Sequence, residues 1–360
     1  MNVLPALLLS SVIIGHSTDK DEIGIRVIDA DPVSGKISVK REICLANAIY
    51  MAPDYDRGMI YVAHALKGFK WNENGAISSY KIVGDDLKRI DTARTFKSVP
   101  CHVSLMGDGR SVCFAEYSFS TCSVVNFGDD GKVLKVYDNI VHEGKLGPRK
   151  DRQDAPHPHC AVPSPDGKYF AVVDLGLDEI RFYSQLSDRI VAHSEKTLRT
   201  EPAGGGPRHL IFHPNGKYAF VIFELANLVS SYSYSDGVLK HIDTQSLLPE
   251  SFKGFSKAAA IKLSKDGKRV FCSNRGHNSI AAFDIDLESG KLTRRGIMKL
   301  DGEFPRDFEF LPGEKVLIAG LKMSNKVVTY KYDSYKCTLT KLDEISSVHK
   351  PLYFAVDRGE

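Results

Sequence analysis

A short turn signal recurs along this chain at nearly regular intervals and limits the folds open to it. Asp-Gly or Asn-Gly dipeptides end at Gly109, Gly167, Gly216 and Gly267, and weaker versions of the turn occur at Arg57-Gly58 and Pro312-Gly313. The intervals between these glycines, from Gly58 to Gly313, are 51, 58, 49, 51 and 46 residues. Such dipeptides supply the positive φ angles of tight hairpins. A period of roughly 50 residues is typical of one blade of a β-propeller.

Each repeated unit shows the pattern of four short strands. Around Gly216, the alternating run Leu210-Ile211-Phe212-His213 precedes the turn, and Tyr218-Ala219-Phe220-Val221-Ile222 follows it. A third run, Leu228-Val229-Ser230-Ser231-Tyr232, comes next, and a second polar turn leads to a fourth strand. Four strands per unit indicate a blade, whereas the repeats of a solenoid, the competing repeat fold, seldom carry four. No long helical periodicity occurs, so the sequence predicts an all-β fold.

The two ends of the chain predict how the ring of blades closes. One further period after Gly313 ends near Gly359, where the chain stops after the first strand of another unit. The N-terminal runs at residues 12–15 and 24–29 resemble the two strands that follow the turn in the preceding unit, at residues 316–320 and 326–330. We therefore predict six internal blades and a seventh blade shared by the N- and C-termini. A ring closed in this way leaves only short, protected edges.

No linker or low-complexity tract divides the chain, so residues 1–360 are predicted to form a single domain. The net charge is only +3, and the densest basic segment, at residues 148–152, is interrupted by Asp151 and interpreted as a solvated loop. We expect no nucleic-acid partner and no membrane partner, because the apolar run from Leu4 to Gly15 is too short to span a bilayer. No Lys or Arg precedes that run, which favours a cytoplasmic protein; secretion through an N-terminal signal is the alternative. The oligomeric state stays open.

Seven scattered cysteines form no C-x-x-C pair and no zinc-ligand spacing with histidine. We expect buried, reduced thiols, with no metal and no other cofactor. Cys160 lies beside His159 and is a candidate nucleophile, but alternation along a strand points the two side chains apart.

The hairpin turns also predict where functional side chains gather. Eight residues of strand span about 26 Å, so residues eight before and eight after a turn glycine lie together at the far end of the blade. His159 and Arg208 precede Gly167 and Gly216 by eight residues, and Glu224 and Arg275 follow Gly216 and Gly267 by eight. Charges of both signs that converge near a central channel favour an active site. A solvent-facing His159 and a structural ion pair between Glu224 and Arg275 are the alternatives.

The same segments resemble the seven-bladed lactonase family, which includes a bacterial type of 6-phosphogluconolactonase and the fungal 3-carboxymuconate lactonising enzyme. The matching stretches extend from about Ile14 to Val356 and are Pro156-His157-Pro158-His159, Asp174-Leu175-Gly176-Leu177-Asp178, Gly206-Pro207-Arg208-His209, Phe212-His213-Pro214, Glu224-Leu225, Ser273-Asn274-Arg275-Gly276-His277, Pro100-Cys101-His102-Val103 and Pro305-Arg306-Asp307-Phe308. The resemblance implies that His159, Arg208, Glu224 and Arg275 form the catalytic set and that no metal takes part. His157 and His209 are neighbours in these motifs and are expected to contact substrate.

The sequence also departs from the family pattern. Where other blade tops tend to carry asparagine or glutamine, this chain carries His64, Glu116, Phe223, Leu321 and Lys322. We interpret these positions as a rewritten rim of the site. Lys322 in this rim, and Arg306 at the opening of the neighbouring blade, are expected to reach a distal anion, and Glu116 is expected to oppose it.

Lactone hydrolysis fits this residue set. Arginines stabilise the charge that develops on a carbonyl oxygen and bind a carboxylate or phosphate, so Arg208 and Arg275 are expected to form an anion cradle. His159 and Glu224 are expected to be the proton-transfer pair, with the choice between them open. The predicted function is hydrolysis of a small anionic sugar-acid lactone, 6-phosphogluconolactone or a relative. A carboxymuconate-type cycloisomerase and a non-catalytic propeller that binds proteins are the alternatives.

Overall fold

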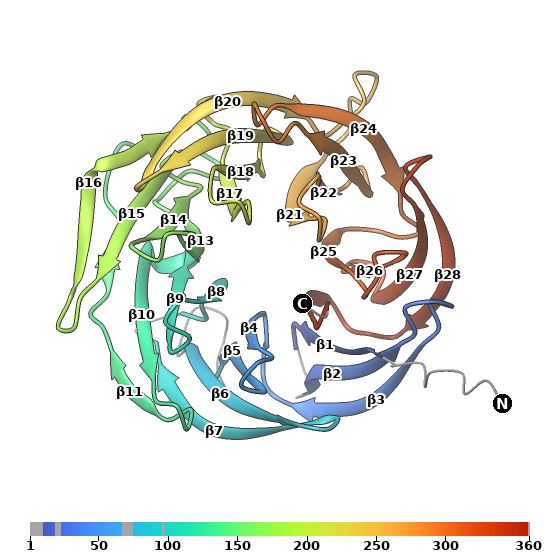
Figure 1. The fold of residues 1–360 in the computed structure, drawn as a ribbon, viewed down its shortest axis with the longest axis horizontal. Coiled ribbons are helices and arrows are strands. Elements are labelled where there is room, and N and C mark those ends of the chain that lie inside the picture. The colour runs from blue at the N-terminus through green and yellow to red at the C-terminus, as the bar shows by residue number, and fades with distance from the viewer. Residues whose placement is uncertain (1–9, 19–22, 67–74, 96–97, 359–360) are drawn as a thin grey trace.

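The structure, a computed structural model, describes residues 10–18, 23–66, 75–95 and 98–358. These residues form seven antiparallel sheets arranged as blades around a central channel (Figure 1). One short 3₁₀ helix, η1 (Tyr117–Phe119), is the only helix in the described ranges. The all-β, seven-bladed prediction is confirmed.

Six blades are built from consecutive segments of chain, with the innermost strand first in sequence. The first three contain β4 (Tyr50–Asp54), β5 (Met59–Ala65), β6 (Gly75–Val83) and β7 (Asp86–Arg94); β8 (His102–Leu105), β9 (Ser111–Glu116), β10 (Thr121–Phe127) and β11 (Val133–Val136), with β12 (Ile140–Val141) also paired to β10; and β13 (Pro158–Pro163), β14 (Phe170–Asp174), β15 (Glu179–Gln185) and β16 (Ile190–Arg199). The next three contain β17 (Pro207–Phe212), β18 (Tyr218–Phe223), β19 (Leu228–Ser235) and β20 (Val238–Ser246); β21 (Lys257–Leu263), β22 (Arg269–Arg275), β23 (Ser279–Ile285) and β24 (Leu292–Lys299); and β25 (Pro305–Phe310), β26 (Val316–Leu321), β27 (Lys326–Asp333) and β28 (Thr338–Ser346).

The seventh blade combines both ends of the chain. The C-terminal strand β29 (Pro351–Val356) lies innermost, followed by β1 (Ser10–His16), β2 (Ile23–Ala30) and β3 (Ile37–Cys44). In the antiparallel register, Ile13 lies opposite Ala355 on one side and Val27 on the other. The predicted closure is confirmed, and the N-terminal run at residues 12–15 lies in a strand that pairs with the C-terminal strand. The first part of the apolar run that begins at Leu4, residues 4–9, lies outside the described residues.

The turn glycines adopt the conformation that the sequence predicted. Gly109, Gly167, Gly216 and Gly267 all have φ between +67° and +71°. The residue before each glycine keeps a negative φ and stabilises the turn through its side chain instead. Asp166, for example, accepts hydrogen bonds from the Ser164 hydroxyl and the Lys168 backbone N–H.

The apolar core lies between neighbouring blades. Every residue of β18 is buried, because that strand has another blade on each of its faces. Phe220 of β18 belongs to one apolar cluster with Val270 and Phe283 of the next blade. The outer strands face solvent, as in β3, which has no fully buried residue. Apolar contacts between neighbouring blades thus hold the seven sheets together and fix the inner strands around the channel.

All seven cysteines are free thiols, and five of them are buried. Cys44 is exposed and Cys101 is half-buried, so the expectation of burial was wrong for these two. Cys44 belongs to the outermost strand β3, where solvent contact follows from the architecture. Within the described residues, no helix has the length and apolar character needed to cross a membrane.

Candidate active site

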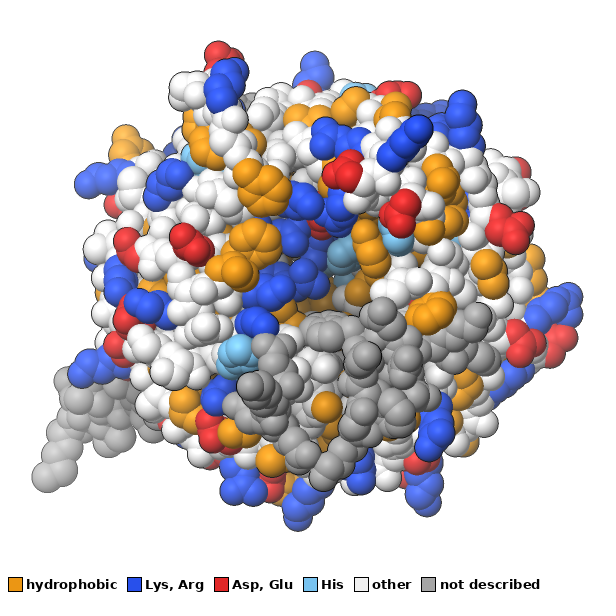
Figure 2. All heavy atoms as spheres, turned by 180° about the vertical axis from the view of Figure 1, so that it is seen from behind, with side chains coloured by type: hydrophobic (Ala, Val, Ile, Leu, Met, Phe, Trp, Pro, Cys, Tyr) orange, Lys and Arg blue, Asp and Glu red, His pale blue; other side chains and the backbone are white. Residues whose placement is uncertain are grey.

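A cavity of about 460 Å³ opens at one end of the central channel. Figure 2 shows the corresponding face, hollowed near its centre, with Lys and Arg side chains gathered around the hollow. The described residues that line the cavity come from several blades and are Ile49, Val99, Cys101, Tyr117, Ser118, Arg152, His159, Glu224, Phe255, Lys257, Arg275, Phe304 and Arg306.

Antiparallel pairing brings the ends of successive strands to this end of the channel. Lys257, the first residue of β21, lies opposite Arg275, the last residue of β22. Glu224 directly follows β18, and His159 is the second residue of β13. His159, Glu224 and Arg275 all line the cavity, so the spacing from the turn glycines located these three side chains correctly.

Irregular pairing positions three of the polar side chains. The ladder between the first two strands of a blade skips one residue at His159, at Arg208 and at Arg306. An extra residue of this kind bends the strand locally and re-aims its side chain, which is why such bulges are frequent beside active sites. His159 and Arg306 thereby reach the cavity, whereas Arg208 takes another direction.

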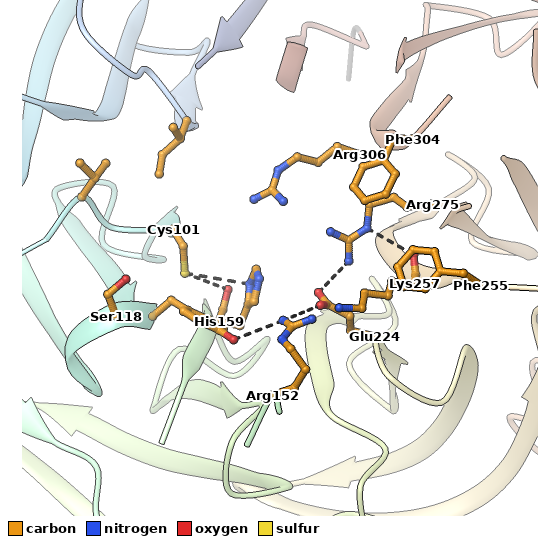
Figure 3. A pocket seen from close by; sticks show the side chains of 13 residues that line it. Cys101, Ser118, Arg152, His159, Glu224, Phe255, Lys257, Arg275, Phe304 and Arg306 are labelled. Atoms are coloured by element: carbon orange, nitrogen blue, oxygen red, sulfur yellow. Dashed lines mark hydrogen bonds and ion pairs between the residues drawn. The ribbon is translucent and has the colours of Figure 1, made fainter. Parts of the chain in front are cut away.

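Glu224 is the electrostatic centre of the site (Figure 3). One of its oxygens accepts from Arg152 at 2.8 Å, and the other accepts from Arg275 at 2.7 Å and from Arg208 at 3.0 Å. Burial by itself raises the pKa of Glu224, but the charges of Arg275 and Arg208 outweigh burial and hold that pKa well below its usual range. Glu224 is therefore ionised, and both of its oxygens are engaged.

Arg208 lies beneath the cavity. It is 2% exposed, and besides Glu224 it contacts the Ala259 carbonyl oxygen and the His209 ring. Burial, followed by the charges of Arg306 and Arg275, lowers the pKa of Arg208 to about 9, so it keeps its charge at neutral pH. Arg208 therefore does not line the cavity beside Arg275, as the predicted anion cradle requires, because its guanidinium binds Glu224 and the Ala259 carbonyl oxygen.

The side chains of two other cations in the cavity, Arg306 and Lys257, are not bound to a carboxylate or carbonyl oxygen of the described residues. Among the described residues, no ion pair or hydrogen bond involves the side-chain nitrogens of Arg306 or Lys257. Figure 3 shows the Arg306 guanidinium extending into the open centre of the cavity. The Lys257 ammonium lies 5.6 Å from the ring centre of Phe255, and the Arg275 guanidinium lies 5.4 Å from that of Phe304. The cavity therefore carries positive charge that the described residues leave unmatched.

His159 is neutral. Burial and the charge of Arg208 lower its pKa well below the usual value, although Glu224 acts in the opposite direction. The Nδ1 atom lies 4.0 Å from the Cys101 sulfur, and no hydrogen bond to the Nε2 atom is found in the described part of the chain. Burial raises the pKa of the Cys101 thiol to about 12, so this cysteine is protonated. His159 is thus available to accept a proton, and Cys101 is a poor nucleophile.

None of the other three predicted contact residues belongs to the described lining of the cavity. His157 stacks on Tyr117 with ring centres 4.1 Å apart and bonds Asp154. His209 lies deeper in the channel and lines a second cavity, of about 390 Å³, that opens at the opposite end. Lys322 follows β26, is half-buried and is absent from the described lining. Whether these three residues contact substrate stays a prediction.

The interpretation of a rewritten rim was wrong for four positions. Phe223 and Leu321 are buried in the apolar clusters between blades. The His64 ring forms a hydrogen bond with the Ser78 hydroxyl. Glu116 accepts hydrogen bonds from the Ser98 N–H at 3.2 Å and from the Thr121 hydroxyl at 2.5 Å. These side chains point into the blades because their strand-end positions pack against neighbouring sheets. Glu116, in particular, does not oppose an anion in the cavity.

Sequence reasoning missed Arg152, Lys257, Tyr117 and Cys101 as lining residues. Arg152 belongs to the long connection between β12 and β13, which was interpreted as a solvated loop. The available signal was the interval of 58 residues from Gly109 to Gly167, the longest in the repeat. An insertion at the cavity end of a blade is a natural source of site residues.

Two buried carboxylates fix the loops that carry the site. Asp174 accepts backbone N–H bonds from His157, Gly176 and Leu177 at 2.8–3.0 Å. Asp178 accepts from the Gln153 side chain and from the backbone N–H groups of Gly204 and Gly206 at 2.7–2.9 Å. The matched family motif around these aspartates therefore supports the site without entering it. In the described ranges, no three His, Cys, Asp or Glu side chains gather in a way that could hold a metal.

The chain matches the family model described as lactonase, 7-bladed β-propeller, over residues 11–356. A 6-phosphogluconolactonase of Bacillus subtilis is 32% identical over 312 residues, which cover 86% of each protein. An uncharacterized protein of Staphylococcus saprophyticus is 30% identical over 337 residues, or 92% of each protein. The solved structure of the periplasmic gluconolactonase PpgL of Pseudomonas aeruginosa superposes with a TM-score of 0.89 at 28% identity, covering 97% of this chain and 99% of that one.

Proposed function

The chain belongs to the seven-bladed β-propeller lactonase family, and on this premise we propose that it hydrolyses a small anionic lactone, 6-phosphogluconolactone or a relative. The observation that carries the proposal is the Arg306 guanidinium, which has no ion pair among the described residues, in a cavity where Arg152 and Arg275 share a single carboxylate. A concave, charged cavity favours an enzyme over a protein-binding platform, which would present an exposed apolar surface instead.

In the proposed reaction, Arg306 and Arg275 bind and polarise the lactone carbonyl oxygen. His159 takes a proton from a water molecule through its Nε2 atom, and the hydroxide adds to the carbonyl carbon. The negative charge moves to the carbonyl oxygen, where fixed cations in a water-poor site stabilise it most. Collapse of this intermediate breaks the bond to the ring oxygen, which takes the proton back from His159 and leaves as a hydroxyl group of the product.

We propose a positioning role for Glu224 and Arg208. Both Glu224 oxygens accept hydrogen bonds from arginines, so neither is free to take a proton from a water molecule, whereas the described residues make no hydrogen bond to the Nε2 atom of His159. The charge of Glu224 holds Arg152 and Arg275 in place and stabilises His159 once the imidazole is protonated. Of the two candidates for the base, His159 is therefore the one we propose.

One observation favours a cycloisomerase as a second candidate. Ile49 and Val99 form an apolar wall, and Phe255 and Phe304 add two aromatic faces. A flat, unsaturated carboxylate lactone suits such surfaces better than a sugar ring rich in hydroxyl groups. Interconversion of a carboxymuconate and its lactone, followed by ultraviolet absorbance, tests this alternative.

Hydrolysis of a panel of lactones by the purified protein tests the proposed function, with the spontaneous rate subtracted. We expect 6-phosphogluconolactone to be hydrolysed with a higher kcat/KM than glucono-lactone. Arg306→Ala should lower kcat/KM by about 10²-fold, as loss of a charge stabiliser does, and Arg189→Ala, on an exposed turn, is the matched control. Wild-type protein that accelerates no lactone, or full activity of Arg306→Ala, would contradict the proposal.

A further inference from the structure

Arg152 and Lys257 place two positive charges together at the outer part of the cavity. Figure 3 shows both side chains directed toward Glu224. Exposure orders the arginines around this carboxylate by depth: the side chain of Arg152 is 25% exposed, that of Arg275 is 7% exposed and that of Arg208 is 2% exposed. Arg152 and the half-buried Lys257 are therefore near solvent, and the reacting centre at His159 and Arg275 lies deeper.

The charges of the cavity do not balance. Four cations line it, Arg152, Lys257, Arg275 and Arg306, against the single anion Glu224, which leaves three positive charges among the described lining residues. A neutral His159 adds nothing to this count. An ester phosphate carries close to two negative charges at neutral pH. A bound phosphorylated lactone would therefore offset two of these three charges, and the oxyanion that forms during hydrolysis leaves the balance unchanged because His159 is protonated in the same step.

We propose that Arg152 and Lys257 form a phosphate subsite at the cavity mouth, and that the enzyme therefore selects lactones with a terminal phosphate group. This inference rests on the proposed lactone hydrolysis, in which Arg306 and Arg275 serve the carbonyl oxygen. Arg152 uses one edge of its guanidinium on Glu224 and the Tyr117 hydroxyl. Lys257 contributes an ammonium that can turn toward a phosphate oxygen.

A purely structural role does not account for Lys257. Burial and the nearby charge of Arg152 lower its pKa, and the charge of Glu224 offsets them only in part, so its present surroundings disfavour the charged ammonium. Within the described residues, no carboxylate lies within ion-pair distance of it to offset that cost. The Phe255 ring below the ammonium is the partner found. A bound dianion would supply the missing counter-charge.

The kinetic test compares two lactones that differ only in the phosphate. Lys257→Gln should raise KM for 6-phosphogluconolactone about tenfold and leave kcat unchanged, because a contact remote from the reacting bond contributes equally to ground-state and transition-state binding. KM for glucono-lactone should not change. Lys240→Gln, on the exposed outer strand β20, is the matched control. Equal effects on the two lactones, or no effect on either, would overturn the subsite.

A binding test separates failure of the subsite from failure of the proposed reaction. Calorimetry with the wild-type protein should show that 6-phosphogluconate binds at least about tenfold more tightly than gluconate, and Lys257→Gln should remove most of that difference. Inorganic phosphate should compete with 6-phosphogluconate. If no lactone is hydrolysed but the phosphate preference persists, the subsite stands and the reaction is wrong. Equal affinities for the two acids would remove the subsite even if hydrolysis is found.

Discussion

Glu224 shows how one carboxylate can serve several arginines with different consequences for each. Arg152 and Arg275 contact it from the cavity, whereas Arg208 reaches it from beneath. A cation at the cavity surface can exchange its contact with Glu224 for one with a ligand. Arg208 is closed off from solvent and can only hold the carboxylate in position. The roles of Arg208 and Arg306 are therefore distinct, although each follows a proline at the start of an inner strand.

Arg208→Ala is expected to destabilise the protein as well as to impair catalysis. The substitution empties a buried volume and removes one partner of a buried ion pair, for which the typical loss is about 3 kcal/mol. Chemical denaturation measures this loss, and Arg275→Ala is the comparison, because Arg275 also contacts Glu224 but lies at the cavity surface. A stability equal to that of the wild type would show that Arg208 does not support the floor of the cavity.

The blade shared by the two ends of the chain decides whether the inner strands form a closed ring. Strand β1 pairs with β29 on one edge and β2 on the other, so it joins the two ends of the chain. Asp307 of the preceding blade accepts the Phe354 N–H at 3.0 Å, and Arg358 contacts Glu309 and Glu314. The sheet and these polar contacts together keep β25 and β29 side by side.

Ile14→Ala should weaken this closure. Ile14 is fully buried in the cluster that contains Val327 and Phe354, and the loss of a buried isoleucine side chain costs about 3 kcal/mol. Val33→Ala is the control, because Val33 is 73% exposed and should change the free energy of unfolding by less than about 0.5 kcal/mol. Thermal and urea unfolding of both variants measure the difference. Equal stabilities would mean that β1 contributes little to closure.

Across the whole molecule, the interior around the channel holds several histidines in their neutral form. Burial, the largest cause in each case, lowers the pKa of His16 to about 3, of His64 to about 4 and of His102 to about 3. In the unfolded chain, these histidines bind protons below about pH 6.5. The unfolded state therefore takes up more protons than the folded state as the pH falls from about 6.5 toward 4.

The protein is thus expected to lose stability on acidification, by about 2 kcal/mol per buried histidine at pH 5. The stability is fully present above about pH 6.5, and it falls as protonation favours the unfolded chain. Thermal unfolding measured from pH 8 to pH 4.5 tests this expectation. The midpoint temperature should stay level down to about pH 6.5 and should decrease at lower pH. His64→Gln should reduce the slope, and His241→Gln, on an exposed position, should not. A flat profile down to pH 5 would contradict the burial of neutral histidines.

The architecture and part of the site could be read from the sequence because they depend on local rules. A turn glycine needs a positive φ, a strand has a fixed rise per residue, and an antiparallel partner returns to the same end. These rules gave the blades, the shared closing blade and the location of His159, Glu224 and Arg275. The interval of 58 residues also marked the insertion that carries Arg152, although its function was not recognised.

Which strand-end side chains enter the cavity depends on contacts between blades, and the sequence does not show these contacts. Arg208 and Arg306 follow the same pattern and occupy equivalent bulges, yet Arg208 is held below the cavity by Glu224 and the Ala259 carbonyl oxygen. Glu116 turns into its blade because Thr121 and the Ser98 N–H satisfy its oxygens there. The position of a residue along a strand follows from its neighbours in sequence. The direction of its side chain depends on charges and packing supplied by other blades, and these partners come together only when the ring closes.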